Sequence, residues 1–431
     1  MKKSVLLLLV FVFIFSVLGI AQSEKPYEGT TITWVYQEHP TTPLYKHKLE
    51  EFEEETGIKV EIVTYPYAEL VEKQRVTYSL GKNEFDVGFV PEVATVEWAE
   101  NGWITALDGF MNDSDLTKDK WVAKDDLFDL ALKAHSYEGQ LWALPAYTES
   151  QVMFYRKDLF EEYNLEVPET WEELLSVCAE LEENLEGTNI SPIVLRARRE
   201  RWNAPYIFGN ILHGYGADYF NYQNMEPALD TANAIKSAQI FSDLLTKYGP
   251  QGPASLNWED VRTMMVQGTA AITIDASGWA STFEASDSKS AGKLGYAPVP
   301  KGPAGRGTGW STNGLFIPKF SDKKEAAWQF IQWALSPENR LYQVTHGSSY
   351  IDRHSVINNP QVVAIHDEFP GFLESLDAGL SSAPDCHYPC SMNAESVAER
   401  VGVALSQIMT GQASAEKAME QANKDIRDMM E

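Results

Sequence analysis

Aromatic rings and hydrogen-bonding side chains stand outside the periodic apolar faces of this chain, in segments with the composition of loops. An aromatic ring can cover the apolar C–H face of a polyhydroxylated molecule. Carboxylates, amides and guanidinium groups can pair with its hydroxyls, because a buried hydroxyl without a partner costs kilocalories. The residues that we expect to supply this chemistry are Tyr36, Glu38, His39, Glu92, Tyr147, Glu149, Arg198, Trp202, Asp275, Ser277, Trp279, Trp310, Asn313 and Arg353, with Trp142 as a further aromatic platform. Each of them could instead be structural or solvated.

Arg198 comes from a group of four arginines in a chain that is acidic overall. A guanidinium group can fork onto paired hydroxyls or onto a carboxylate. The alternative is a solvated loop whose arginines balance nearby glutamates. Trp202 and Tyr206 follow directly, and this favours the wall of a pocket.

A second interpretation of the carboxylates is a secreted glycoside hydrolase, with Glu149 and Asp275 as its pair. Such an enzyme needs two carboxyl groups about 5–10 Å apart, but any acidic chain offers many pairs. Ser311 does not lie in a G-x-S-x-G nucleophile elbow, and the glycine-rich segment 305–309 lacks the phosphate-loop pattern. The spacings H-x-x-x-H and C-x-x-C are also missing, so we expect neither a metal nor a cofactor.

Length and charge narrow the class of protein. A chain of 431 residues is too long for one ordinary domain, which favours two lobes. Its 44% hydrophobic and 23% charged residues indicate a globular protein. The formal net charge of −27 disfavours nucleic acid and anionic membrane surfaces as partners, since both require basic patches. A third class, adhesion or structural proteins, would show repeats or a β-rich pattern, and neither is seen.

Residues 1–21 have the pattern of a signal peptide. Lys2 and Lys3 precede an apolar run over 5–18, and Gly19-Ile20-Ala21 forms a small-x-small cleavage site. A membrane anchor is the alternative, but the run is shorter than the ~20 residues of a spanning helix. No cysteine lies near the cleavage point, so a lipid anchor is not supported. We therefore expect a periplasmic or otherwise extracytoplasmic protein.

Three cysteines occur in the chain. Cys178 shares a helical face with leucines and is expected to be buried. Cys386 and Cys390 could form a disulfide that closes a tight loop in an exported protein. His387 between them raises a metal site as the alternative, but two thiols and one imidazole are too few for a closed zinc site.

Strands and helices alternate in the first hundred residues. Strands are expected at 31–36, 59–63 and 85–90, and helices at 45–55, 68–80 and 92–100. This spacing predicts a parallel sheet with helical crossovers, and ligands bind beyond the carboxyl ends of such strands. Those ends are 36–39 and 90–92, which include Glu38, His39 and Glu92.

Residues 139–160 are the stretch around which the chain is organised. We expect a short strand over 141–144, a polar loop after Pro145, and a second strand over 152–155 that leads into a helix near Asp158. Two short strands joined by such a loop would suit a crossing between lobes. An ordinary hairpin with a polar loop is the alternative.

Several short motifs in and after this stretch occur in the same order as in the extracellular solute-binding proteins of sugar ABC importers. The chain therefore resembles this family, which includes proteins like maltose-binding protein. The resemblance rests on Gly139 to Pro145, Tyr-Arg-Lys-Asp-Leu-Phe over 155–160, and Glu169-Thr170-Trp171-Glu172-Glu173-Leu174. It continues through 258–275, 309–318, 323–336 and the last two helices, and so covers nearly the whole mature chain. Trp310 stands where the family commonly has glycine, and Ile351 where it has proline.

The resemblance implies an α/β, two-lobed periplasmic-binding-protein fold of the type II-like class, in which each lobe is a mainly parallel sheet flanked by helices. We expect lobe 1 to hold 22–143 and 272–318, and lobe 2 to hold 144–271 and 319–431, with about three hinge crossings. The implied function is that of a monomeric, non-enzymatic binding component that delivers its ligand to the permease of an ABC importer. The expected ligand is a neutral carbohydrate: a monosaccharide, polyol, cyclitol or short oligosaccharide.

Overall fold

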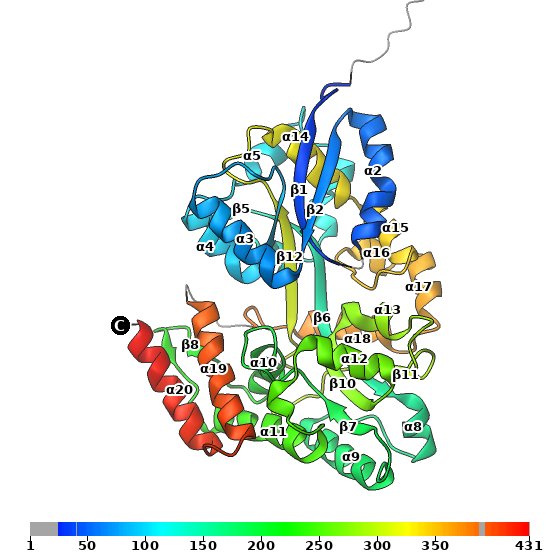
Figure 1. The fold of residues 1–431 in the computed structure, drawn as a ribbon, viewed down its shortest axis with the longest axis vertical. Coiled ribbons are helices and arrows are strands. Elements are labelled where there is room, and N and C mark those ends of the chain that lie inside the picture. Colours follow the sequence, from blue (N-terminus) through cyan, green and yellow to red (C-terminus); the bar gives the residue numbers. More distant parts are fainter. Residues whose placement is uncertain (1–24, 40, 388–392, 431) are drawn as a thin grey trace, which may run out of the picture.

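A computed structural model describes residues 25–39, 41–387 and 393–430, and shows two lobes stacked along the long axis (Figure 1). Each lobe has its own hydrophobic core. The core of lobe 1 includes Trp34, Phe89 and Trp328, and the core of lobe 2 includes Trp171, Phe208 and Phe241. This arrangement confirms the predicted two-lobed α/β fold, with helices around the sheets of both lobes.

Lobe 1 is built on the predicted alternation of strands and helices. Strand β1 pairs in parallel with β2, with Thr31 opposite Lys59, and Val35 N donates to Val87 O at 3.0 Å just before β3. The elements of its first part are β1 (Thr31–Gln37), α2 (Thr42–Thr56), β2 (Lys59–Tyr65), α3 (Tyr67–Ser79), β3 (Gly88–Pro91), α4 (Glu92–Glu100), α5 (Asp108–Met111), α6 (Asp119–Val122), α7 (Asp129–Ala134), β4 (Ser136–Tyr137) and β5 (Gln140–Leu141).

Two long strands, β6 (Leu144–Arg156) and β12 (Trp310–Phe316), run between the lobes (Figure 1). The prediction of two short strands with a loop at 147–151 was wrong, because β6 is continuous. It pairs antiparallel with β12 over the lobe 1 half and with β10 and β11 over the lobe 2 half. Pro145 is tolerated because the register with β12 shifts beside it, between Asn313 and Gly314.

Lobe 2 continues the same sheet. Strand β10 pairs antiparallel with β6 and in parallel with β7, so the sheet is mixed rather than purely parallel. Helix α9 begins with the predicted capping box, in which Thr170 and Glu173 bond reciprocally. The elements before the return to lobe 1 are α8 (Lys157–Glu162), α9 (Trp171–Asn184), β7 (Ser191–Val194), α10 (Ala204–Gly214), β8 (Phe220–Asn221), β9 (Glu226–Pro227), α11 (Ala232–Tyr248), α12 (Trp258–Gln267), β10 (Ala270–Ala276), α13 (Ala280–Phe283) and β11 (Leu294–Pro298).

The predicted lobe boundaries differ from the observed packing. Residues 272–299 were assigned to lobe 1, but Ile272, Ile274 and Val299 lie in the lobe 2 core, because the chain does not cross back until β12. Residues 319–350 were assigned to lobe 2, but α14 and Tyr350 pack in the lobe 1 core. The remaining elements are α14 (Lys324–Ala334), α15 (Pro337–Thr345), α16 (His354–Ile357), α17 (Pro360–His366), α18 (Phe372–Ser382), α19 (Ala394–Met409) and α20 (Ala415–Met430).

A third crossing lies between Tyr350 in the lobe 1 core and Phe372, which packs beside the lobe 2 sheet. Cys178 is a free thiol in the lobe 2 core, as predicted. Cys386 is disulfide-bonded, and Cys390, its expected partner, lies outside the described residues, as does the expected signal peptide. Within the described ranges, no helix has the length and apolar character to cross a bilayer.

Candidate ligand-binding cleft

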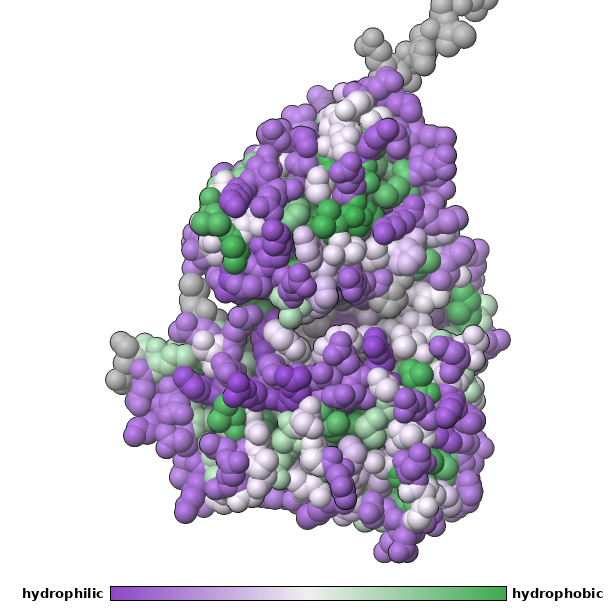
Figure 2. Space-filling view, in the orientation of Figure 1, coloured by the Kyte–Doolittle hydropathy of each residue, from purple (hydrophilic) through white to green (hydrophobic). Residues whose placement is uncertain are grey.

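A cavity of about 430 Å³ lies between the lobes, where the surface is visibly hollowed (Figure 2). This volume falls within the range of small-molecule sites. Lobe 1 and the crossing strands contribute the end of β1, the starts of α3 and α4, and the middle of β6 and β12. Lobe 2 contributes the segment before α10, the start of α12 and the turn after β10. The lining residues are Gln37, Glu38, His39, Pro66, Tyr67, Glu92, Tyr147, Glu149, Arg196, Arg201, Trp202, Tyr206, Trp258, Glu259, Arg262, Trp279, Ser311, Asn313 and Tyr350.

Eight of the residues expected from the sequence line this cavity: Glu38, His39, Glu92, Tyr147, Glu149, Trp202, Trp279 and Asn313. The rule that ligands lie beyond the carboxyl ends of strands found three of them. Glu38 and His39 follow β1, and Glu92 follows β3 at the first position of α4.

The structure places the other expected residues elsewhere. The Tyr36 ring lies in the lobe 1 core, 4.5 Å from that of Trp34. Arg198 is exposed and pairs with Glu200 at 2.7 Å, Ser277 is buried beside the cavity, and Arg353 is buried and donates to the carbonyl of Leu335. Trp310 Nε1 donates to Pro384 O at 2.8 Å, and Trp142 packs against the lobe 1 core.

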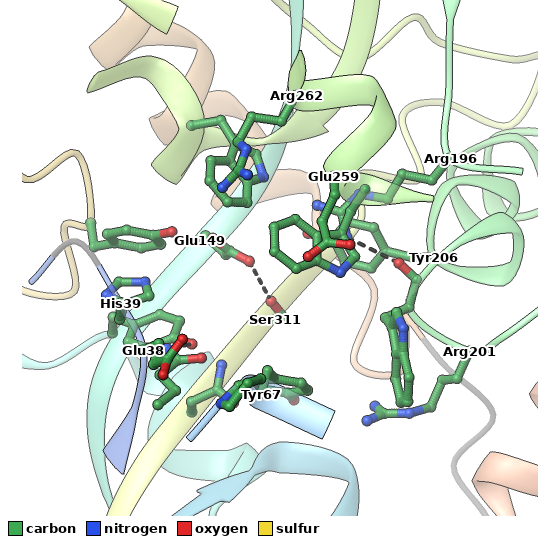
Figure 3. A pocket seen from close by; sticks show the side chains of 18 of the residues that line it. Glu38, His39, Tyr67, Glu149, Arg196, Arg201, Tyr206, Glu259, Arg262 and Ser311 are labelled. Carbon is green, nitrogen blue, oxygen red and sulfur yellow. Dashed lines mark hydrogen bonds between the residues drawn. The ribbon is translucent and has the colours of Figure 1, made fainter. Parts of the chain in front are cut away.

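Asp275, also expected to contact ligand, instead holds Arg196. Arg196 Nε donates to Asp275 Oδ2 at 2.9 Å and Nη2 donates to Oδ1. Both side chains are buried, so the carboxylate is engaged and does not line the cavity. The guanidinium lies over the Tyr206 ring at 4.6 Å and reaches the cavity wall (Figure 3). The arginine group was noticed in the sequence, but only the fold selects Arg196 and Arg201 over Arg198.

Several cavity residues were missed altogether. They are Gln37, Pro66, Tyr67, Trp258, Glu259, Arg262, Ser311 and Tyr350. Arg196, Arg201 and Tyr206 also line the cavity; their segment was expected to form a pocket wall, but these three were not named as ligand contacts. Three of the missed residues, Trp258, Glu259 and Arg262, lie at the start of α12. A signal was present there, because Asn257 and Asp260 form a capping box that marks a helix start. The local sequence does not show, however, that the first turn of α12 faces the cavity, because this depends on long-range packing.

Aromatic rings form opposing walls. Trp258 and Trp279 stack with ring centroids 5.5 Å apart and an interplanar angle of 16°. The Arg262 guanidinium lies 5.3 Å and 5.5 Å from the two ring centroids. On the lobe 1 side, His39 stacks on Tyr147 at 5.1 Å. Apolar faces are thus presented to the cavity from both lobes.

Two carboxyl groups in the cavity are perturbed by their surroundings. Burial raises the pKa of Glu149 to about 7, although Arg196 and the hydrogen bond from Ser311 oppose the rise. Burial likewise raises the pKa of Glu92 to about 7 against the effect of Arg201. Burial lowers the pKa of His39 to about 3, so its imidazole is neutral at physiological pH. These groups can donate and accept hydrogen bonds without imposing a strong charge.

Asn313 adds a polar group with unused capacity. Its side chain is buried in the cavity wall, and its Oδ1 has no hydrogen-bond partner within the described part of the chain. A buried acceptor without a partner costs roughly 1–3 kcal/mol. A hydroxyl group of a bound solute would remove this cost.

A sequence profile described as bacterial extracellular solute-binding protein matches residues 38–341, about seven tenths of the chain. The chain belongs to this family. It is 29% identical over 299 residues to a mannitol-binding protein of Pseudomonas aeruginosa, covering 68% of this chain and 64% of the relative, so the match spans just under two thirds of that protein. It is 25% identical over 373 residues to an erythritol/L-threitol-binding protein of Mycolicibacterium smegmatis, covering 82% of this chain and 77% of the relative.

The solved structures of the family share the fold. A solute-binding protein of Agrobacterium radiobacter, in complex with ribitol, superposes with a TM-score of 0.83 at 22% identity. The match covers 94% of this chain and 100% of the other. The predicted two-lobed fold is therefore confirmed over almost the whole chain.

Proposed function

We propose that this protein captures a small neutral polyol or sugar between its lobes and delivers it to the permease of an ABC importer. The observation that carries the proposal is a cleft that presents aromatic faces from both lobes together with hydrogen-bonding groups, of which Glu149, Glu92 and His39 carry reduced charge because they are buried. The stacked Trp258 and Trp279 can cover C–H groups, while Glu149, Asn313 and Ser311 can pair with hydroxyls. The relatives named above for mannitol and erythritol or L-threitol favour acyclic polyols within this class.

The proposal extends to place and partners. We propose an extracytoplasmic protein, exported by the segment 1–21, that acts as a monomer and meets permease subunits when its lobes close around ligand. Closure would be a hinge shift between two populations, driven by the higher affinity of one of them. Family membership supports this role.

The structure does not support Glu149 and Asp275 as the catalytic carboxylate pair of a glycoside hydrolase. Asp275 is bonded to Arg196 on both carboxylate oxygens and lies outside the cavity lining. Glu149 and Asp275 therefore do not face a common substrate, as a general acid and its partner must.

A thermal-shift and calorimetry panel tests the proposal. The mature protein is mixed with D-mannitol, ribitol, erythritol, myo-inositol, D-glucose and maltotriose, with L-glutamate as an ionic control of similar size. A solute at 100 times its dissociation constant adds about 2.7 kcal/mol to the stability of the folded state. Stabilisation by a polyol or sugar, with no product after long incubation, is the expected result. Stabilisation by L-glutamate alone, or consumption of a glycan, would contradict the proposal.

A further inference from the structure

A chain of ion pairs connects the two lobes beside the ligand cavity. Its centre is Glu395, in the first turn of α19 on lobe 2. Glu395 Oε2 lies 3.6 Å from Arg75 Nη2 on α3 of lobe 1, and Glu395 Oε1 lies 3.8 Å from Arg201 Nε. Arg75 Nη1 also donates to Glu97 Oε1 on α4 at 2.9 Å. One carboxylate thus joins a guanidinium of each lobe.

Arg201 carries this chain into the ligand site. It lines the cavity (Figure 3), and its side chain is only 6% exposed. Its guanidinium lies over Trp202, 5.5 Å from the ring centroid. It also acts on lobe 1 groups, because it opposes the burial that raises the pKa of Glu92 to about 7 and that of Tyr67 to about 12. Arg201 of lobe 2 is therefore close enough to Glu92 and Tyr67 of lobe 1 to affect their pKa values, and its Nε lies 3.8 Å from Glu395 Oε1.

Arg75, Arg201 and Glu395 also line a small cavity of about 180 Å³ beside the ligand cavity. It is lined by Tyr67, Ala68, Val71, Glu72, Arg75, Arg201, Trp202 and Glu395. Tyr67, Arg201 and Trp202 also line the ligand cavity. Glu395 thus contacts Arg75 of α3 on one side and Arg201 on the other, at the edge of the ligand cavity.

We propose that Glu395 is a positioning residue that holds Arg201 at the ligand cavity and, through Arg75, ties this contact to the approach of the two lobes. The inference rests on the proposed solute-binding function for its ligand-dependent part. Glu395 is 49% exposed and Arg75 29% exposed, so salt screens the interaction and its effect is modest. An effect of Glu395 that acts through charge should weaken as the salt concentration rises, whereas an effect that acts through packing should not.

The first test measures D-mannitol binding by calorimetry in 20 mM and 500 mM NaCl. Glu395→Gln should weaken binding about two- to fivefold at low salt, with little difference from the unmodified protein at high salt. Arg75→Gln should have a smaller effect, because the contact between Glu395 and Arg201 remains. Glu399→Gln, one turn along α19 at an exposed position, is the matched control and should bind normally.

A second control tests whether binding depends on the position of Arg201 or on any ion pair that joins the two lobes. Lys133 on α7 pairs across the cleft with Asp385 at 2.7 Å but has no place in the ligand cavity. Lys133→Gln should bind D-mannitol as the unmodified protein does. An equal loss in Lys133→Gln, unchanged binding in Glu395→Gln, or the same loss at both salt concentrations would overturn the proposal.

Small-angle scattering of the ligand-free protein decides the inter-lobe part without any ligand. Arg75→Gln and Glu395→Gln should show a larger radius of gyration than the unmodified protein and Glu399→Gln in 20 mM NaCl. Equal radii would overturn the role of Glu395 between the lobes. If the unmodified protein gives no D-mannitol signal while the radii differ, the choice of ligand class fails and the inter-lobe contact stands.

Discussion

Gly278 leaves no room for a side chain because the Tyr350 ring occupies that space. A Cβ atom on Gly278 would lie 2.2 Å from Tyr350 Cε1 and 2.3 Å from Cζ. Gly278 belongs to the short 3-10 helix Ser277–Trp279 on lobe 2, whereas Tyr350 packs in the lobe 1 core and lines the ligand cavity. The contact sets how the ring meets the opposite lobe.

Gly278→Ala should therefore weaken ligand binding about tenfold, because Tyr350 or the turn that carries Trp279 must shift. Overpacking of this kind costs roughly 1–3 kcal/mol, and tenfold corresponds to about 1.4 kcal/mol. Calorimetry with the ligand found in the solute panel measures the effect. Gly109→Ala is the control, since no atom lies within 4 Å of its added Cβ. Equal affinity in both variants would contradict the prediction.

Asp275→Asn should destabilise the protein by about 3–5 kcal/mol, because it leaves the buried Arg196 guanidinium without a compensating charge. Denaturant unfolding without ligand measures this loss. Asp243→Asn removes a carboxylate that pairs with the exposed Lys247 at 3.1 Å, and should cost less than about 1 kcal/mol. A similar small cost for Asp275→Asn would show that Arg196 does not depend on this pair.

The sequence was sufficient where local pattern decides structure. Strands β1 and β2, the helices α2 and α3 that follow them, and the capping box at Thr170 all follow from periodicity and capping chemistry. The residues after β1 and β3 followed from the rule on strand ends. The continuous β6 did not, because Pro145 and the polar residues after it resemble a loop. Its strand state depends on pairing with β12, more than 150 residues away.

The site was harder to predict for the same reason. Trp279 and Trp310 have equivalent chemistry and both follow glycine. Trp279 stacks on Trp258 at the cavity, whereas Trp310 bonds to Pro384 away from it. Arg196 and Arg198 are likewise separated only by tertiary partners, Asp275 for one and Glu200 for the other. Long-range packing decides which side chains point into the cleft between the lobes, and the local sequence does not show it.

The buried carboxyl groups of the cavity should add a component to the stability of the ligand-free protein that falls as pH rises from 5 to 8. Glu149 has a pKa of about 7 when folded and about 4.3 when unfolded, so the folded state binds the proton more tightly. Its contribution is complete below pH about 4.3 and is lost as pH rises through 7. Glu149→Gln should remove part of this fall, on the order of 1 kcal/mol.

Urea unfolding at pH 5, 6, 7 and 8 measures that slope, with Glu399→Gln as the control at an exposed position. Glu92 should contribute a second, similar component, because burial raises its pKa to the same region. His39 should act in the opposite direction, because burial lowers its folded pKa to about 3 while the unfolded value is about 6.5. The unfolded state then binds more protons, so this component of the stability rises as pH increases from 5 to about 7. Identical slopes in Glu149→Gln and the unmodified protein would show that the carboxyl is hydrated in solution.

Trp279→Ala should weaken polyol binding about tenfold or more, because it removes one face of the Trp258 stack and the support of Arg262. Calorimetry measures affinity, and thermal unfolding without ligand verifies that the variant folds. Trp310→Phe is the matched control: it removes the hydrogen bond to Pro384 but changes no residue that lines the ligand cavity, and affinity should be retained. Loss of binding in Trp310→Phe with normal binding in Trp279→Ala would contradict the prediction. It would show that Trp310, and not Trp279, provides the surface on which the ligand's C–H groups lie.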